Sequence, residues 1–292
     1  MSLQYQNLFN TYVRKTARPM SAYHYSSIFA WSDHFDFCFE VIKDQLCVFA
    51  YQGKDSLLYL PPLGDHVDMD VVKECFRVMG GRSIARIENI MDNQLPSFKA
   101  GGYNVHEKAQ EYVYRNKDLQ DLNGPGFKSK RHDVHVFLKR FPQAVFRDFT
   151  PKDQSGCAAL YAAWAQGRRQ KESDPIYVQM LEENVGVHAK LISHADPLGF
   201  IGRIVEIDGV IVGYTFGYPL NETTFCVALE IVDLNRSGLA AFIFNSFCKD
   251  TLVRGFDLIN TMDDFGMPNI AHAKMSYHPV HQMPIYNIKE NK

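Results

Sequence analysis

The sequence predicts an α/β (α+β) protein of two similar halves, each a mixed, mostly antiparallel sheet flanked by helices. One observation is the order of elements, because three β-type runs, a helix, a strand and a late strand recur in both halves. A second is the Asp208-Gly209 pair between two β-type runs, which is typical of a tight antiparallel hairpin. The repeat favours duplication, and a chance likeness of two α/β stretches is the alternative.

The first half is expected to span residues 1–122. Its best-defined helix is 69–79, where apolar residues recur at helical spacing. Turn-forming residues such as Lys43-Asp44-Gln45 separate the short strands. The expected elements are two opening helices, three strands, a helix and two further strands, at 3–17, 24–31, 35–42, 46–51, 57–60, 69–79, 84–87 and 108–114.

Residues 123–143 are expected to connect the halves as a basic amphipathic helix after a turn. The Asn-Gly-Pro-Gly run at 123–126 is a strong turn signal, and Pro142 ends the helix that follows. Within Lys128–Phe141, apolar residues at 134, 137, 138 and 141 form one stripe. A basic stripe flanks it, formed by Lys128, Arg131, His135 and Lys139.

The second half is expected to span residues 144–292 and to repeat the order of the first. Thr150 and Pro151 suit the N-cap and the first position of a helix. The expected strands are 144–149, 200–207, 210–216, 224–232, 256–260 and 281–288, and the expected helices are 151–166, 175–193 and 239–253.

The composition is that of an ordinary globular protein of 292 residues, with 46% hydrophobic and 22% charged residues. A net charge of −2 excludes a broad basic field, so any contact with a polyanion must be local. Six scattered cysteines without a Cys-x-x-Cys pair predict reduced core thiols. No apolar segment is long enough for a signal sequence or a membrane span, which predicts a soluble cytoplasmic protein without a transmembrane segment. No metal site is expected, because His132 and His135 have no evident third ligand.

Two segments carry unusual residues at matching spacing. Glu111–Tyr114 with Asn123–Arg131 is similar to E-Y-L-Y … G-x-K-Y-x-K-K-R-N-H, and Asn260–Gly266 with Ala273–Pro279 is similar to N-x-E-x-D-L-G … K-x-S-Y-x-P. Both patterns are those of the phosphatidylglycerol lysyltransferase C-terminal-like family, which the chain resembles from Glu111 to its end. Glu230 lies where that family tends to place a glutamate.

The resemblance implies two tandem GNAT-like domains, akin to the Fem-type peptidyltransferases, with the C-terminal domain as the catalytic one. It implies transfer of an acyl group from acyl-CoA or aminoacyl-tRNA to an amine or hydroxyl, on a small molecule or a lipid headgroup. Met262 replaces a glutamate of the family pattern. A non-catalytic CoA- or nucleotide-binding module with the same fold is therefore one alternative, and an unrelated α/β hydrolase or regulatory protein is another.

Acyl transfer needs a cradle for the anionic donor, a group that handles the proton, and hydrogen-bond donors for the oxyanion. The start of helix 239–253 is a candidate cradle, because free N–H groups and the helix dipole favour a phosphate there. Its loop is a loose version of the GNAT pyrophosphate loop, and an ordinary helix start capped by Ser237 is the alternative. The expected cofactor-binding residues are Asn235, Arg236, Ser237 and Gly238.

Three residues are candidates for catalysis. Glu230 is a lone acid in the apolar run 227–232, where burial raises a carboxyl pKa and suits a general base; a surface-facing glutamate is the alternative. Tyr277 is a candidate donor to the leaving group, and Asp264 is expected in the same cleft. The alternatives are packing in a C-terminal strand, a polar turn and a solvated helix face. The expected substrate-binding residues are Lys128, Lys130, Arg131, Asn260, Asp263, Lys274 and Ser276.

Overall fold

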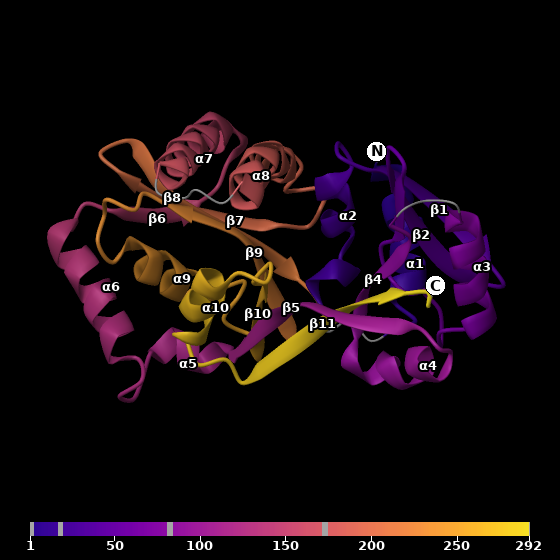
Figure 1. Ribbon diagram of the computed structural model, residues 1–292. Helices are drawn as coiled ribbons and strands as arrows, with labels where there is room; N and C mark the ends of the chain where they lie inside the picture. Colours follow the sequence, from indigo (N-terminus) through magenta and orange to yellow (C-terminus); the bar gives the residue numbers. More distant parts are fainter. Residues whose placement is uncertain (1–2, 17–19, 81–83, 171–174, 292) are drawn as a thin grey trace. The chain divides into compact units, whose positions relative to one another are not determined.

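The computed structural model describes residues 3–16, 20–80, 84–170 and 175–291, and the chain forms two compact units (Figure 1). Unit 1 consists of Met1–Tyr112, Met262–Lys274 and His281–Lys292, and unit 2 consists of Val113–Thr261 and Met275–Val280. This division differs from the expected boundaries at 122 and 144. The basic helix belongs to unit 2 rather than to a separate connector, and the last strand returns to unit 1.

In unit 1, three strands form an antiparallel meander, namely β1 (Asp36–Ile42), β2 (Gln45–Gln52) and β3 (Asp55–Leu58). Strand β4 (Arg86–Met91) is parallel to β3, and β11 (His281–Lys289) is antiparallel to β4. The other elements are η1 (Leu3–Tyr5), α1 (Gln6–Val13), η2 (Ser21–Tyr23), α2 (Tyr25–Trp31), α3 (Met69–Met79), η3 (Asp92–Gln94), α4 (Leu95–Ala100), β5 (Asn104–Arg115), which ends in unit 2, and α10 (Pro268–Met275).

Helix α3 shows why the apolar pattern of this unit folds as it does. Its apolar stripe, which includes Cys75, Phe76 and Met79, is buried in one core with side chains of β2, β3, β4 and β11. Each large buried side chain contributes roughly 1.5–3 kcal/mol relative to an exposed one. The Asp68 side chain accepts a hydrogen bond from the Asp70 N–H at 2.8 Å and caps the helix. The prediction of a helix over 69–79 is confirmed.

In unit 2, four strands are antiparallel neighbours, namely β6 (Val145–Asp148), β7 (Ile201–Ile207), β8 (Val210–Pro219) and β9 (Thr224–Val232). Strand β10 (Leu258–Asp263), whose last two residues belong to unit 1, is parallel to β9. Helices α7 (Gln154–Arg169) and α8 (Pro175–Ser193) cover one face, while α6 (Lys128–Arg140) and α9 (Leu239–Lys249) cover the other (Figure 1). Phe137 of α6 is fully buried among β7, β8, β9 and α9 side chains. The remaining elements are α5 (Asn116–Asp121) and η4 (Pro151–Asp153).

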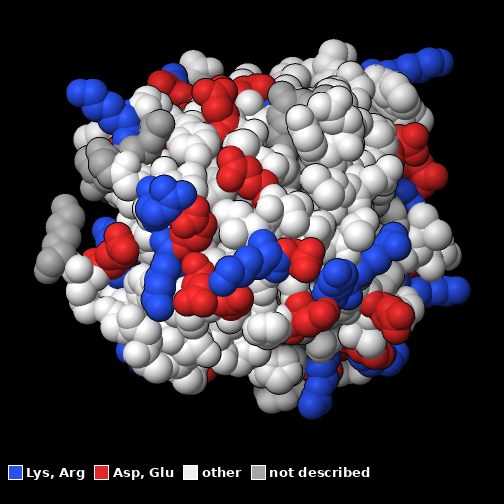
Figure 2. Space-filling model, turned by 90° about the vertical axis from the view of Figure 1, so that its right-hand side faces the viewer, with Lys and Arg blue, Asp and Glu red and all other residues white. Residues whose placement is uncertain are grey.

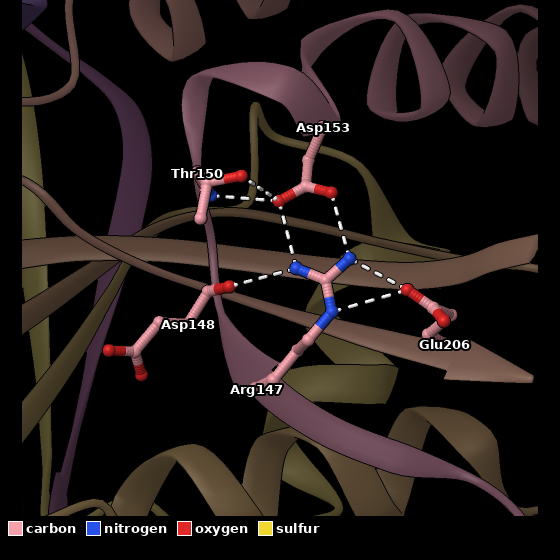
Figure 3. Close-up of polar contacts among 5 residues, drawn as sticks. All are labelled: Arg147, Asp148, Thr150, Asp153 and Glu206. Carbon is pink, nitrogen blue, oxygen red and sulfur yellow. Dashed lines mark hydrogen bonds and ion pairs between the residues drawn. The ribbon is translucent and has the colours of Figure 1, made fainter. Parts of the chain in front are cut away.

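An ion-pair network fastens the edge strand β6 to the rest of unit 2 (Figure 3). The Arg147 guanidinium donates two hydrogen bonds to the Asp153 carboxylate, at 2.8 and 2.9 Å, and reaches Glu206 on β7 at 2.7 Å. Asp153 Oδ2 also accepts the Thr150 N–H at 2.8 Å and the Thr150 hydroxyl at 2.9 Å. The expected N-cap at Thr150 is thereby confirmed, and an edge strand is joined to the start of the next helix.

Several expected elements are wrong in extent or kind. Helices α4, α5 and α10 were not expected, and α9 ends at Lys249 rather than at 253. Lys274 lies in α10, and Tyr277 lies in the turn before β11, so neither is a strand residue. The sequence of helix α10 has no apolar stripe, and accordingly the helix buries no side chain. The helix expected at 3–17 has its last residue outside the described range.

Candidate functional site

Glu230 is a carboxylic acid held inside unit 2. It lies on β9 opposite Thr215 of β8, and it keeps some accessible surface. Its Oε2 atom is buried and has no hydrogen-bond partner among the described residues. Burial raises the pKa of Glu230 to about 8, and Thr215 opposes this shift. The conditional prediction of a buried acid with a raised pKa is therefore met, and the surface-facing alternative is not.

Tyr277 lies in the same unit as Glu230, and the charge of Glu230 acts on the Tyr277 hydroxyl. Its ring meets Phe244 of α9 edge to face, with centroids 5.0 Å apart. Burial raises the pKa of Tyr277, and the nearby Glu230 raises it further. A phenol in this position stays protonated and can donate a hydrogen bond or a proton.

Lys130 of α6 covers the Tyr277 ring. Its ammonium nitrogen lies 4.1 Å from the ring centre, within the range of a cation–π contact. Burial lowers the pKa of Lys130, while the neighbouring Asp133 opposes that shift. Two of the predicted residues, Tyr277 and Lys130, are thus in contact, and Glu230 is near enough for its charge to raise the Tyr277 pKa.

The β9–β10 pair frames this region. The two strands are paired in parallel at three positions, from Thr224–Leu258 to Cys226–Asn260, and the pairing ends there. Beyond Cys226, β9 continues beside β8 with an irregularity at Ala228, two residues before Glu230. Asn260 is fully buried at the last paired position. Among the described residues, the β9 edge that carries Glu230 is therefore not paired with β10.

The loop before α9 packs against α6, where the sequence predicted a cradle for a phosphate. Gly238 is the N-cap in the left-handed region, with φ +83°, so Ser237 is not the cap. A Cβ atom at Gly238 would lie 2.0 Å from the Asp133 carbonyl oxygen, so the close approach that this glycine allows is that of the α6 backbone. Arg236 is paired with Asp233 at 3.1 Å and covers the Phe141 ring. Asn235 and Ser237 are exposed beside it.

Apart from Lys130, the lysine and arginine residues of α6 divide into two groups. Arg131 donates to the Leu122 and Gly124 carbonyl oxygens, the latter at 2.8 Å, and so holds the turn before the helix. Lys128, Lys139 and Arg140 are exposed, and within the described part of the chain they form no ion pair. On the face seen in Figure 2, by contrast, basic and acidic side chains are intermixed. Exposed basic side chains of this kind form a local surface that attracts a polyanion.

Asp263, Asp264 and Lys274 belong to unit 1, where Lys274 of α10 bonds back to the turn that follows β10. Asp264 Oδ2 accepts the Tyr112 hydroxyl at 2.7 Å, and its Oδ1 accepts the Gly266 N–H at 2.9 Å. The Lys274 ammonium donates to the Met262 and Asp263 carbonyl oxygens at 3.0 and 2.6 Å. Burial raises the pKa of Asp263, against Lys108 and Lys274. These contacts correspond to the polar turn that was the alternative for the Asp263–Asp264 pair.

Sequence reasoning missed the neighbours that shape these groups. Thr215 and Phe244 adjoin Glu230 and Tyr277, and Tyr112 holds Asp264. The Asp208-Gly209 turn sets the register of β7 against β8, whereas Thr215 lies opposite Glu230 in the β8–β9 pair, so that turn does not identify Thr215. No sequence signal indicates the contact between Tyr112 and Asp264, which are far apart in the chain. Ser276 precedes Tyr277 in the same turn.

The described residues contain no group of three or more His, Cys, Asp or Glu side chains that could hold a metal ion. Across the described ranges, no helix combines the length and apolarity required to cross a bilayer.

Solved structures share the fold. A conserved protein of unknown function from Bacteroides thetaiotaomicron is 22% identical, with a TM-score of 0.86 over 100% of this chain and 98% of its own. L-PGS from Bacillus licheniformis is 14% identical, with a TM-score of 0.65 over 98% and 91%. A tandem GNAT protein from the clavulanic acid biosynthesis pathway is 10% identical, with a TM-score of 0.57 over 99% and 97%. The chain therefore has a tandem GNAT-like fold.

The sequence comparisons assign the family. No significant match was found among curated proteins. Residues 14–289 match the family described as phosphatidylglycerol lysyltransferase, C-terminal, which covers nearly the whole chain. An acyl- or aminoacyl-transferase type of fold follows from this match and from the shared architecture. The chain belongs to the phosphatidylglycerol lysyltransferase C-terminal family.

Proposed function

We propose that this protein is an acyl- or aminoacyltransferase whose reacting groups lie in unit 2. The single observation that carries the proposal is the Glu230 carboxyl, whose buried Oε2 is free and whose strand edge is not paired with β10 at this position. A buried carboxyl oxygen without a hydrogen-bond partner is costly to keep, so it indicates a group that a ligand completes. The family supports the same class of reaction.

Glu230 acts as the general base for the acceptor. An amine or hydroxyl attacks the donor carbonyl carbon, and its proton passes to the Glu230 carboxylate as the new bond forms. A pKa of about 8 makes this carboxylate a stronger base than an exposed glutamate, and the ionised fraction grows as the pH rises.

Tyr277 acts as the acid for the departing group. Its raised pKa keeps the phenol protonated, so it can donate a proton when the carbonyl–sulfur or carbonyl–oxygen bond of the donor breaks. Lys130, over the ring, adds positive charge on the side where the leaving group becomes negative. Each proton that leaves the acceptor is thereby matched by one given to the leaving group.

The donor is an aminoacyl-tRNA or an acyl-CoA. The exposed residues Lys128, Lys139 and Arg140 on α6 favour a tRNA, because phosphates bind such a local basic surface. The small net charge of −2 favours the smaller CoA donor. Arg236 is already paired with Asp233, and the α6 backbone occupies the space next to the Gly238 Cα atom. The start of α9 therefore supports a CoA donor less than α6 supports a tRNA.

A non-catalytic binding module with the same fold is the second candidate, and Met262 favours it. The family pattern has a glutamate at this position, whereas here Met262 supplies a carbonyl oxygen to Lys274. This candidate predicts that the donor binds and that no acyl group moves.

The test measures binding and transfer separately. Lysyl-tRNA, uncharged tRNA, acetyl-CoA and CoA are titrated into the purified protein, and transfer from either donor is followed with phosphatidylglycerol vesicles and with small amines as acceptors. We expect Glu230→Gln and Tyr277→Phe each to slow transfer by about 10²-fold or more while donor affinity is kept. Glu222→Gln, in an exposed loop, is the matched control. Binding without transfer in the wild type supports the module, and unchanged transfer in E230Q and Y277F contradicts the proposed site.

A further inference from the structure

The six residues Met275–Val280 have an unusual place in the chain. They belong to unit 2, whereas the segments before and after them, Met262–Lys274 and His281–Lys292, belong to unit 1. Tyr277 lies in the middle of this short segment. Tyr277 is not part of a helix or strand of unit 2, so its position there depends on the contacts that these six residues make.

One contact is made by the side chain of His278. A Cβ atom at Gly126 would lie 2.6 Å from His278 Nε2, so the imidazole ring rests directly on this glycine. The Phe127 ring meets His278 edge to face, with centroids 5.2 Å apart at 84°. Gly126 does not have a positive φ, so its value here is the space it leaves and not its backbone freedom. The turn before α6 thus forms a seat for one imidazole.

The backbone of the segment is bent at the same residue. His278 has φ +56°, in the left-handed region that non-glycine residues seldom adopt, and its N–H donates to the Met275 carbonyl at 3.0 Å. The Val280 N–H donates to the Val113 carbonyl at 2.8 Å and fixes the end of the segment to unit 2. A strained residue persists where surrounding contacts hold it, and the seat at Gly126 and Phe127 is such a contact.

Because of this bend, the adjacent side chains of Tyr277 and His278 contact different residues. The His278 ring contacts Gly126 and Phe127, while the Tyr277 ring contacts Phe244 and Lys130. Two adjacent side chains are thereby fastened to different parts of unit 2. Fixing one of them limits the movement of the other.

We propose that His278, seated on Gly126 and Phe127, is a positioning residue that holds Tyr277 against Phe244 and Lys130. The catalytic consequence rests on the proposed function, in which Tyr277 is the acid. The contact itself exists independently of any reaction, so it is tested by a signal from Tyr277 as well as by activity.

The variants separate the ring contact from the backbone strain. Gly126→Ala places a methyl group against the imidazole and leaves His278 unchanged. His278→Ala removes the ring, and His278→Asn removes the ring but tolerates the left-handed backbone. The double variant G126A/H278A restores the space for the methyl group. Gly167→Ala is the control, because nothing lies within 4 Å of a Cβ atom there.

The primary measurement is the ¹⁹F NMR spectrum of protein labelled with 3-fluorotyrosine, with the Tyr277 resonance assigned from Y277F. We expect G126A and H278A to shift or broaden that resonance while the other tyrosine resonances stay in place. The double variant should differ little from H278A, because the methyl group no longer meets a ring. A Tyr277 resonance that is unchanged in both single variants overturns the proposal. His278 is exposed, so H278A remains informative even if G126A folds poorly.

The kinetic measurement connects the contact to the reaction. In H278A and H278N we expect kcat to fall by about 10-fold or more with little change in the KM of the donor, since a misplaced group acts on the chemical step. A changed resonance with unchanged kcat shows that His278 places Tyr277 and that Tyr277 is not the acid. An unchanged resonance with reduced kcat contradicts the positioning role while leaving the proposed function intact.

Discussion

Glu230 and Asp153 show how the same kind of side chain acquires opposite properties. Glu230 lies on an apolar strand, has no cationic partner in the described part of the chain, and its pKa is raised by burial to about 8. Asp153 is bonded to Arg147, and this contact lowers its pKa to about 2. Because the pKa of Glu230 is raised, folding becomes less favourable as the pH rises toward 8. Because the pKa of Asp153 is lowered, its contribution to folding stability is present above the ordinary pKa of an aspartate. The first arrangement is typical of a reactive group and the second of a structural one.

The Arg147–Asp153 pair is testable through acid unfolding. Because the folded pKa of Asp153 lies below its unfolded value, its contribution is full above about pH 4 and disappears as the pH falls to about 2. We expect Asp153→Asn to lower the free energy of unfolding at pH 7 by on the order of 2 kcal/mol, and this deficit to vanish near pH 2. Urea titrations at several pH values measure the difference.

The control for that experiment is Asp196→Asn, on an exposed turn. It should leave the free energy of unfolding nearly unchanged at every pH. A D153N deficit that persists at pH 2 would assign the effect to lost packing rather than to the carboxylate charge.

The elements differ in how far the sequence determines them. Helix α3 was predicted at its observed ends because its apolar stripe and its cap are local. Helix α10 was missed because it buries nothing, and its last turn is held by Lys274 bonding back to the Met262 and Asp263 carbonyls. In the site, Glu230 stood out as a lone acid in an apolar strand. The partner of Asp264 could not be predicted, since Tyr112 comes from a distant strand.

The packing of α6 on the start of α9 gives a prediction at this scale. Gly238→Ala combines a left-handed backbone with a methyl group 2.0 Å from the Asp133 carbonyl. We expect it to lower the free energy of unfolding by about 2 kcal/mol or more, measured by urea denaturation.

Gly209→Ala is the matched comparison for the backbone term. Gly209 has φ +77° with nothing within 4 Å of its Cβ position, so it tests the strain without the clash. If both variants are equally destabilised, the close contact between α6 and α9 contributes nothing beyond the backbone.

At the scale of the whole molecule, the chain order and the two units do not coincide. Strand β11 comes last in the sequence yet pairs with β4 and buries Ile285 and Ile288 in unit 1. The two repeated halves were predicted from local patterns. The return of the last strand was not, because pairing between residues about 200 positions apart leaves no periodicity in either segment.

The return of β11 to unit 1 predicts which unit each of the late strands stabilises. Ile288→Ala on β11 and Ile259→Ala on β10 remove equally buried side chains from units 1 and 2. Each should cost about 2–5 kcal/mol. Hydrogen exchange measured by mass spectrometry should show lost protection in β4 and α3 for I288A, and in β9 and α9 for I259A. Equal loss in both units for both variants would contradict the division.

The central claim is that Glu230 is the base of an acyl-transfer site in unit 2. The measurement that tests it most directly is the pH dependence of transfer from lysyl-tRNA and from acetyl-CoA, with the uncatalysed rate subtracted, in the wild type and in E230Q. We expect the wild-type rate to rise through about pH 8 and then level off, and the E230Q rate to be low and flat. A variant that keeps the wild-type rate and the same pH profile would contradict it.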